Sequence, residues 1–149
     1  MISNKDLKKI KNLKRPLVFI PMAVDLIHFG HIRILNKSKK LGTVIVGLMT
    51  DKGLQSYKGK PLMSYKHRKE IITELKSVDY VIPLNGLKYL QICNVLKPNY
   101  FVHGTDWKNG IQSKKRDQLI KEQKLWGGKV KEFTSTKNVS STKLKKLVK

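Results

Sequence analysis

The sequence has little cysteine and no long apolar run. A single cysteine, Cys93, stands in 149 residues. It excludes an internal disulfide and a cysteine-based metal cluster, and it favours a reducing compartment. No apolar run approaches the roughly 20 residues that a membrane-spanning helix needs, and residues 1–15 lack the apolar stretch of a signal peptide. We therefore expect a soluble protein of the cytoplasm that does not bind a membrane.

Acidic residues are also scarce, since 10 Asp and Glu stand against 32 Lys and Arg and leave a formal net charge of +22. Such a charge favours polyanionic partners, either nucleotides or nucleic acid. The basic residues are spread along the chain, with dense clusters only at its two ends, and all but four of them are Lys. Base readout usually employs Arg. A solvated Lys-rich surface is therefore the plainer interpretation, and a basic nucleic-acid-binding domain is the alternative from another functional class.

Apolar runs alternate with helical patterns along the whole chain. We predict strands at 16–22, 43–49, 78–83, 99–103 and 129–133, and helices at 31–41, 64–76, 86–97, 113–126 and from 140 or 141 onward. This alternation indicates right-handed crossovers in a parallel sheet. The predicted fold class is α/β: a single Rossmann-like doubly wound domain of about five parallel strands over residues 16–149, preceded by a basic N-terminal segment, 1–15. Ligands of such sheets bind beyond the carboxyl ends of the strands.

The sharpest motif follows the first predicted strand and reads Asp25-Leu26-Ile27-His28-Phe29-Gly30-His31. Two histidines three residues apart at the start of a helix lie beside unpaired backbone amides and the positive end of the helix dipole. Gly30 removes a side chain where a bulky anion needs close approach to the backbone. The motif predicts a phosphate cradle, with a pair of surface or capping histidines as the alternative. Two His without Cys or clustered carboxylates make a poor zinc site, so we predict no protein-bound metal.

A strand that leads into Asp-Leu-x-His-x-Gly-His resembles the nucleotidyltransferases of the cytidylyltransferase group. These small α/β enzymes join a nucleoside triphosphate to a phosphorylated compound and release pyrophosphate. The likeness continues in order over residues 16–146: residues 65–70 resemble the family's arginine-bearing helix, 103–107 its fourth-strand loop and 135–142 its closing signature. The resemblance implies a CTP-dependent enzyme that uses Mg2+ and forms a homodimer.

The resemblance also assigns roles by position. His28 and His31 would bind the triphosphate and stabilise the transition state, Lys58 would reach the phosphates, and Arg68 would hold a phosphate bidentately; these four are the implied catalytic residues. The implied nucleotide-binding residues are Met22, Ala23, Gly30, Lys60, His103, Asp106, Ser140, Ser141 and Thr142, and the implied substrate-binding residues are Asp25 and Lys137. The alternatives are solvated loop lysines, a surface Arg68 paired with Glu70 or Glu74, and turn-capping aspartates.

Departures in the closing signature bear on the acceptor. Ser135 stands where the glycerol-phosphate and the eukaryotic phosphocholine or phosphoethanolamine enzymes typically have Arg. Lys137, with residues 140–144 and the loop 56–58, looks more like the bacterial cytidylyltransferases of phosphonate metabolism. These make the CMP ester of 2-aminoethylphosphonate and are sometimes fused to a phosphoenolpyruvate mutase. We therefore expect 2-aminoethylphosphonate as acceptor and a mutase as a candidate pathway partner. Phosphocholine, phosphoethanolamine and glycerol 3-phosphate are alternative acceptors, and ATP stays open as donor.

Overall fold

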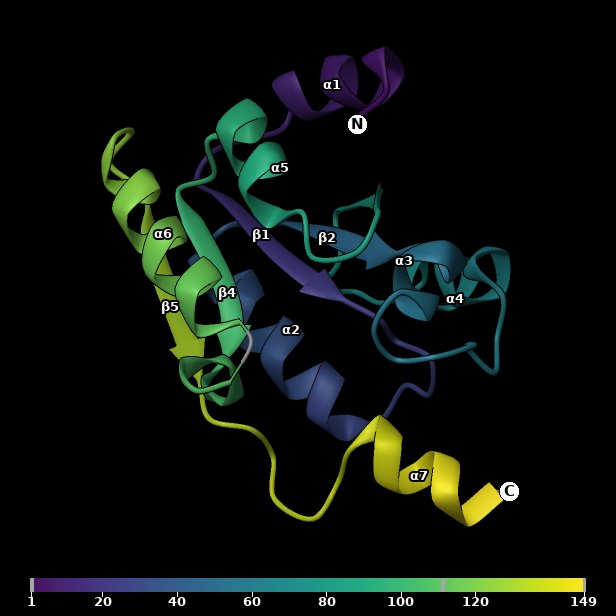
Figure 1. Ribbon diagram of the computed structural model, residues 1–149. Helices are drawn as coiled ribbons and strands as arrows, with labels where there is room; N and C mark the ends of the chain where they lie inside the picture. Colours follow the sequence, from purple (N-terminus) through teal and green to yellow (C-terminus); the bar gives the residue numbers. More distant parts are fainter. Residues whose placement is uncertain (1, 111, 149) are drawn as a thin grey trace.

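The computed structural model describes residues 2–110 and 112–148, in which strands and helices alternate (Figure 1). The strands are β1 (Leu17–Met22), β2 (Thr43–Met49), β3 (Tyr80–Leu84), β4 (Tyr100–Gly104) and β5 (Lys129–Phe133). The helices are α1 (Asn4–Lys11), α2 (Phe29–Leu41), α3 (Asp51–Gln55), α4 (Tyr65–Thr73), α5 (Tyr89–Leu96), the 3-10 turn η1 (Thr105–Lys108), α6 (Ser113–Lys124) and α7 (Ser141–Val148).

The five strands form one parallel sheet in the order β3-β2-β1-β4-β5. The chain runs outward from the central strand β1 to β3 and then returns to place β4 on the other side of β1. The direction of winding therefore reverses between β1 and β4, and the crevice at their carboxyl ends is where such sheets bind ligands. The predicted Rossmann-like doubly wound fold is confirmed.

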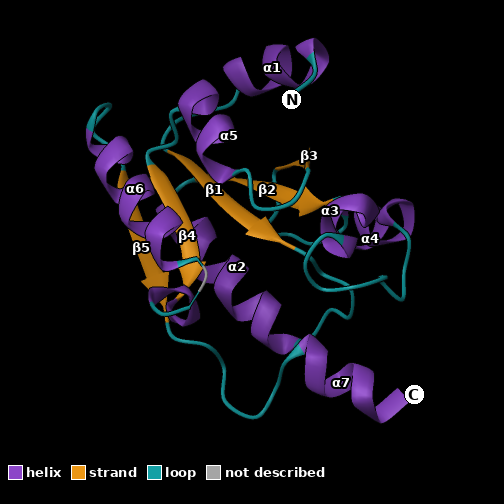
Figure 2. Cartoon of the chain, viewed as in Figure 1, coloured by secondary structure: helices purple, strands orange, loops and turns teal. Residues whose placement is uncertain are grey.

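Helices cover both faces of the sheet, as Figure 2 shows. Leu17 and Phe19 of β1 belong to the core under α1, α5 and α6, whereas Val18 and Ile20 belong to the core under α2 and α4. All four side chains are at most 2% exposed. Successive strand residues point to opposite faces, so a strand covered on both sides reads as the continuous apolar run seen in the sequence.

The N-terminal segment, expected to precede the domain, contains a helix that packs on the core. Residues 4–11 form α1, which Ser3 caps by accepting a hydrogen bond from the Asp6 amide at 3.1 Å. Ile10 is buried in the core under α1, and Leu7 packs against the same core. The lysines of α1 are exposed to solvent. Because they dominate the composition of the segment, the composition alone does not reveal the apolar side of the helix. In the described part of the chain, no helix is long and apolar enough to cross a membrane.

Candidate active site

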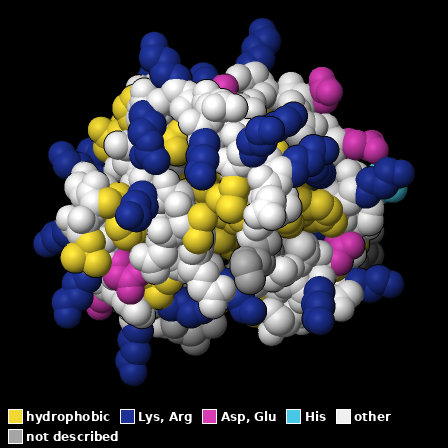
Figure 3. Space-filling model, turned by 90° about the horizontal axis from the view of Figure 1, so that it is seen from above, with side chains coloured by type: hydrophobic (Ala, Val, Ile, Leu, Met, Phe, Trp, Pro, Cys, Tyr) yellow, Lys and Arg dark blue, Asp and Glu magenta, His cyan; other side chains and the backbone are white. Residues whose placement is uncertain are grey.

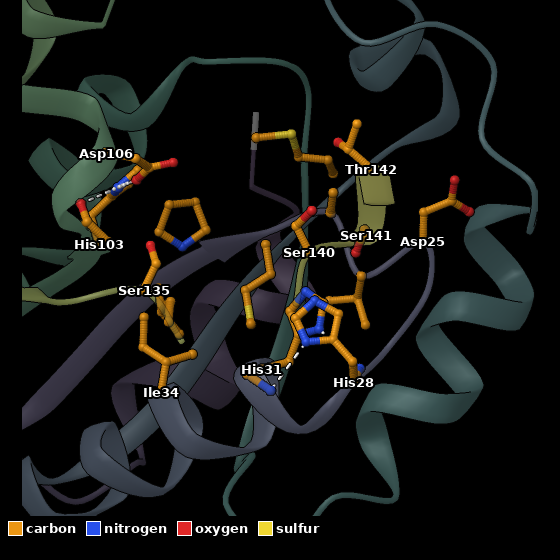
Figure 4. Close-up of a pocket in the computed structure, with 18 of the residues that line it drawn as sticks. Asp25, His28, His31, Ile34, His103, Asp106, Ser135, Ser140, Ser141 and Thr142 are labelled. Atoms are coloured by element: carbon orange, nitrogen blue, oxygen red, sulfur yellow. Dashed lines mark hydrogen bonds and ion pairs between the residues drawn. The ribbon is translucent and has the colours of Figure 1, made fainter. Parts of the chain in front are cut away.

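A cavity of about 630 Å3 opens at the carboxyl ends of β1 and β4, at the reversal of the strand order. Its volume falls within the roughly 300–1,000 Å3 typical of small-molecule sites. Figure 4 shows side chains from the β1–α2 turn, from the end of β4 and from the segment before α7 converging on it. The predicted site residues that line the cavity are Met22, Ala23, Asp25, His28, Gly30, His31, Lys58, His103, Asp106, Ser140, Ser141 and Thr142.

The two motif histidines cap the start of α2 through their Nδ1 atoms. His28 Nδ1 accepts a hydrogen bond from the Gly30 amide, and His31 Nδ1 accepts one from the His28 amide, each at 3.1 Å. A neutral imidazole has one donor and one acceptor nitrogen, so both rings carry their proton on Nε2. The ring centroids lie 3.9 Å apart at the cavity wall. The backbone thereby sets two N–H donors beside the amides of a helix N-terminus.

Both histidines are held in the neutral form. Burial, followed by repulsion from His28 and Lys58, lowers the pKa of His31 to about 4. Burial also lowers the pKa of His28. Protonation would place a proton on each Nδ1, where a backbone N–H already points, so the capping geometry acts in the same direction as burial. The pair can therefore donate hydrogen bonds to an anion at neutral pH without itself carrying charge.

Gly30 leaves room that any other residue would fill. A Cβ built on it would lie 2.8 Å from His28 Cε1 and 2.9 Å from His28 Nδ1. The β-carbon would also come 3.5 Å from the Cβ of Thr136, another residue that lines the cavity. The glycine therefore lets the His28 ring fold back over the first turn of α2, and the close approach of an anion to the backbone at this position stays a prediction.

The end of β4 forms another part of the wall. His103 Nδ1 lies 3.0 Å from the Gly104 carbonyl and 3.8 Å from Asp106 Oδ1. Its ring stacks on Trp107, with centroids 4.0 Å apart and planes 7° apart. Trp107 itself is 2% exposed and donates from Nε1 to Glu132 at 2.6 Å. The tryptophan thus closes the end of the sheet and supports His103.

The N-terminus of α7 completes the wall, and its serines are engaged in holding it. Ser140 Oγ accepts from the Lys143 amide at 3.1 Å, which makes Ser140 the cap of the helix. Ser141 Oγ donates to the Leu26 carbonyl at 3.0 Å and ties the helix to the turn after β1. The backbone amides at this end of α7, with the helix dipole, can serve an anion.

Asp25 is buried rather than open to a substrate, since only 2% of it is exposed. Its oxygens accept hydrogen bonds from the amides of Leu62 and Met63, each at 2.9 Å, and it pairs with Lys145 of α7. Burial alone would raise the pKa of Asp25, but hydrogen bonds from Lys145 and the two amides lower it on balance. The implied substrate-binding carboxylate is therefore already bound by the protein.

Arg68 is placed differently from both of its sequence interpretations, because its side chain is fully buried. The guanidinium donates to the carbonyls of Met63, Ala23 and Met49 at 3.0, 2.7 and 2.7 Å, and to Asp51 at 2.7 Å. It therefore joins the ends of β1 and β2 to the start of α4 and is no phosphate clamp. The sequence does not distinguish an arginine whose N–H groups donate to backbone carbonyls from one whose N–H groups are available to a ligand.

The turn between Ala23 and Asp25 is strained. Val24 has a φ of 53° and is 1% exposed. A β-branched residue rarely adopts this left-handed conformation, which costs about 1–3 kcal/mol. Arg68 holds the carbonyl on one side of Val24 and the contacts of Asp25 hold the other side, so the surrounding structure imposes the conformation.

Lys60 and Lys137 do not line the cavity in the part of the chain that the structure describes, although their neighbours Gly59 and Thr136 do. Sequence reasoning missed three other cationic residues that do line it: Arg33, Lys37 and Lys145. Arg33 and Lys37 are four residues apart on α2, a spacing that puts them on one side of the helix that His31 begins. That signal was available in the sequence, whereas nothing distinguished Lys145 within the Lys-rich tail.

Within the described residues, no cluster of three or more His, Cys, Asp or Glu side chains is placed to hold a metal ion. Of the cavity carboxylates, Asp25 is engaged by protein donors, and the Asp106 side chain is 76% exposed. Mg2+ is commonly held by one or two carboxylates together with substrate phosphates. The residues present therefore fit Mg2+ only as a complex with a triphosphate, with Asp106 as the available carboxylate.

A Rossmann-like sheet with paired imidazoles at a helix N-terminus in the ligand crevice defines a nucleotidyltransferase-type domain. The comparisons with known proteins agree. The chain belongs to the cytidylyltransferase-like family, whose sequence model matches residues 23–147. This result confirms the family resemblance seen in the motifs.

Among curated proteins, the chain is 35% identical over 105 residues to the bifunctional protein HldE of Campylobacter jejuni subsp. doylei. It is also 35% identical over 106 residues to the bifunctional protein HldE of Helicobacter pylori strain G27. The matches cover 68% and 69% of this chain, but only 23% of each relative. The chain thus spans less than a quarter of the length of these relatives.

Among solved structures, the chain is similar to the lipopolysaccharide core biosynthesis protein from Thermoplasma volcanium, with a TM-score of 0.65 and 27% identity. That match covers 83% of this chain and 98% of the other. A pantoate-beta-alanine ligase from Francisella tularensis matches with a TM-score of 0.66 at 19% identity, over 97% of this chain and 74% of the other. The latter likeness concerns the fold alone.

Proposed function

We propose that the protein transfers a nucleotidyl group from a nucleoside triphosphate to a phosphate or phosphonate oxygen of a small acceptor and releases pyrophosphate. The observation that carries the proposal is the pair of imidazoles at the N-terminus of α2 in the cavity, whose Nδ1 atoms accept backbone hydrogen bonds and so leave the proton of each neutral ring on Nε2. Family membership supports the same reaction class.

The chemistry requires little beyond positioning and charge neutralisation. The acceptor oxygen is ionised at neutral pH, so it attacks the α-phosphorus without a general base. The bond from that phosphorus to the bridging oxygen breaks, and the electron pair leaves with pyrophosphate. Nε2–H of His28 and His31, the α2 amides and Lys58 would stabilise the charge that develops on the phosphate oxygens. Mg2+, carried on the triphosphate, would supply further neutralisation of its oxygens.

We propose CTP as donor and a sugar phosphate as acceptor. The family description supports CTP. The lipopolysaccharide core is built of sugars, so the similar Thermoplasma protein supports a sugar phosphate. The charges of the cavity point the same way: Arg33, Lys37, Lys58 and Lys145 line it, and Lys145 neutralises Asp25. An uncharged sugar suits such a wall better than the ammonium group of 2-aminoethylphosphonate.

The phosphonate acceptor stays the alternative that the closing signature favours, and a mutase partner applies only to that case. A panel of CTP and ATP against a sugar 1-phosphate, 2-aminoethylphosphonate, phosphocholine and glycerol 3-phosphate, with pyrophosphate release as readout, separates these proposals. A homodimer stays a prediction, which light scattering of the purified protein tests.

Variants show whether the imidazole pair carries the reaction. His28→Asn and His31→Asn should each lower kcat by on the order of 100-fold, as loss of a transition-state donor does. His67→Asn, an exposed histidine on α4, is the matched control and should leave kcat unchanged. If no pair of substrates yields pyrophosphate with the wild-type protein, or if His31→Asn turns over normally, the proposal is wrong.

A further inference from the structure

One carboxylate joins two walls of the cavity that lie far apart in the sequence. Asp25 Oδ1 accepts from the Met63 amide and Oδ2 from the Leu62 amide, each at 2.9 Å, and Oδ2 also pairs with Lys145. The side chain of Asp25 is 2% exposed and that of Lys145 is 26% exposed. Removal from water strengthens such a pair relative to a surface one.

The first wall, α7, depends on polar contacts with the turn after β1. None of its residues is buried, and Leu147 and Val148 are 82% and 68% exposed. Its two side-chain contacts to that turn are Ser141 Oγ to the Leu26 carbonyl at 3.0 Å and Lys145 to Asp25. A helix without a buried side cannot rely on the hydrophobic effect for its position. The pair with Asp25 is therefore a main determinant of where Ser140–Thr142 stand.

The second wall is the loop before α4, which carries Lys58 into the cavity lining. Gly59 in this loop has a φ of 89°, and a β-carbon built on it would meet nothing within 4 Å. The loop is therefore open to solvent around Gly59, and the backbone of residues 62 and 63 fastens it to Asp25. Lys58 lies between this attachment and the end of α3, where its amide donates to the Leu54 carbonyl at 2.8 Å, so Asp25 holds the far end of the loop that carries Lys58.

We propose that Asp25 is a positioning residue that fixes the Lys58 loop and α7 together, so that the two walls close on the triphosphate as one unit. The inference rests on the proposed nucleotidyl transfer, and Asp25 does not itself touch the substrate. Its two oxygens accept from three protein donors, and the positive charge of Lys145 neutralises its negative charge.

Hydrogen exchange of the full-length protein tests the coupling without any activity. Asp25→Asn keeps the shape of the side chain but turns one oxygen into an NH2 group, which faces protein donors. Exchange should rise about tenfold or more at residues 62–63 and in α7 alike. Lys145→Met should raise it in α7 and leave residues 62–63 protected. Lys146→Met removes the same charge from an exposed neighbour in the same helix and should change neither segment.

Kinetics supply the second readout. Asp25→Asn and Lys145→Met should each raise KM for the triphosphate by about tenfold and change kcat by less than about threefold. The double variant should resemble Asp25→Asn, because both substitutions break one contact. If Asp25→Asn raises KM while both segments stay protected from exchange, Asp25 acts on the substrate and the inference is wrong. If exchange rises as expected but the wild-type protein releases no pyrophosphate, the coupling stands and the proposed function fails.

Discussion

Acidification from pH 8 to pH 5 should weaken the fold through His31. The pKa of this residue is about 4 in the folded protein, against 6.5 for an unperturbed histidine. Between these two values the unfolded chain binds the proton and the folded protein does not, so stability falls as the pH falls below 6.5. The two pKa values make the free energy of unfolding about 2 kcal/mol smaller at pH 5 than at pH 8.

Guanidinium titrations at pH 8, 7, 6 and 5 measure this loss. The carboxyl groups titrate mostly below this window, so the histidines dominate it, and His28 acts in the same direction because its pKa is also lowered. His31→Asn keeps an acceptor for the His28 amide but cannot bind the proton, so it should lose about 2 kcal/mol less than the wild type over the same range. Equal losses in the two proteins would refute the reasoning that burial holds His31 neutral.

Three further predictions concern charge and packing. Arg68→Met should lower the free energy of unfolding by about 3–5 kcal/mol, because three carbonyls and Asp51 lose their donor; an unfolding titration that shows a loss below about 1 kcal/mol would contradict the buried network. Gly30→Ala should push the His28 ring from its cap, as the new Cβ would lie 2.8 Å from Cε1, and so lower kcat by about tenfold or more with little change in Tm. With a net charge of +22, kcat/KM should fall severalfold between about 50 and 300 mM salt while kcat stays constant; a flat salt profile would exclude electrostatic steering.

Figure 3 shows where the basic excess lies on one face of the molecule: Lys and Arg side chains are scattered around apolar patches. Only four cationic side chains, those of Arg33, Lys37, Lys58 and Lys145, line the cavity in the described part of the chain. The rest of the charge therefore acts through the electrostatic field that it adds around the molecule. The excess is mostly a property of the surface and not of the site.

The sheet was predictable because burial on both faces forces continuous apolar runs. All five strands lie within two residues of the expected ranges. The predicted helices are present: α2 begins two residues earlier than expected, and α4, α5 and α6 are shorter than expected. Helix α1 was missed because four lysines dominate its composition, although Leu7 and Ile10 are three residues apart and share one side of the helix.

The histidine motif was also readable in sequence, since capping and anion binding at a helix N-terminus involve residues within four positions of one another. The roles of Arg68 and Asp25 were not. Arg68 reaches Ala23 across 45 residues and Met49 across 19. Lys145 meets Asp25 across the whole domain. Whether such a charged residue faces a ligand or the protein depends on which segments the crossovers bring beside it.

By itself, the sequence therefore determined the parallel sheet, the family and the histidine turn at the start of α2, because each depends on a local pattern of burial or spacing. Only the tertiary structure decided which charged residues serve the cavity and which hold it together. The reason is physical: a buried carboxylate or guanidinium must find partners, and those partners come from whichever backbone groups the fold leaves within reach.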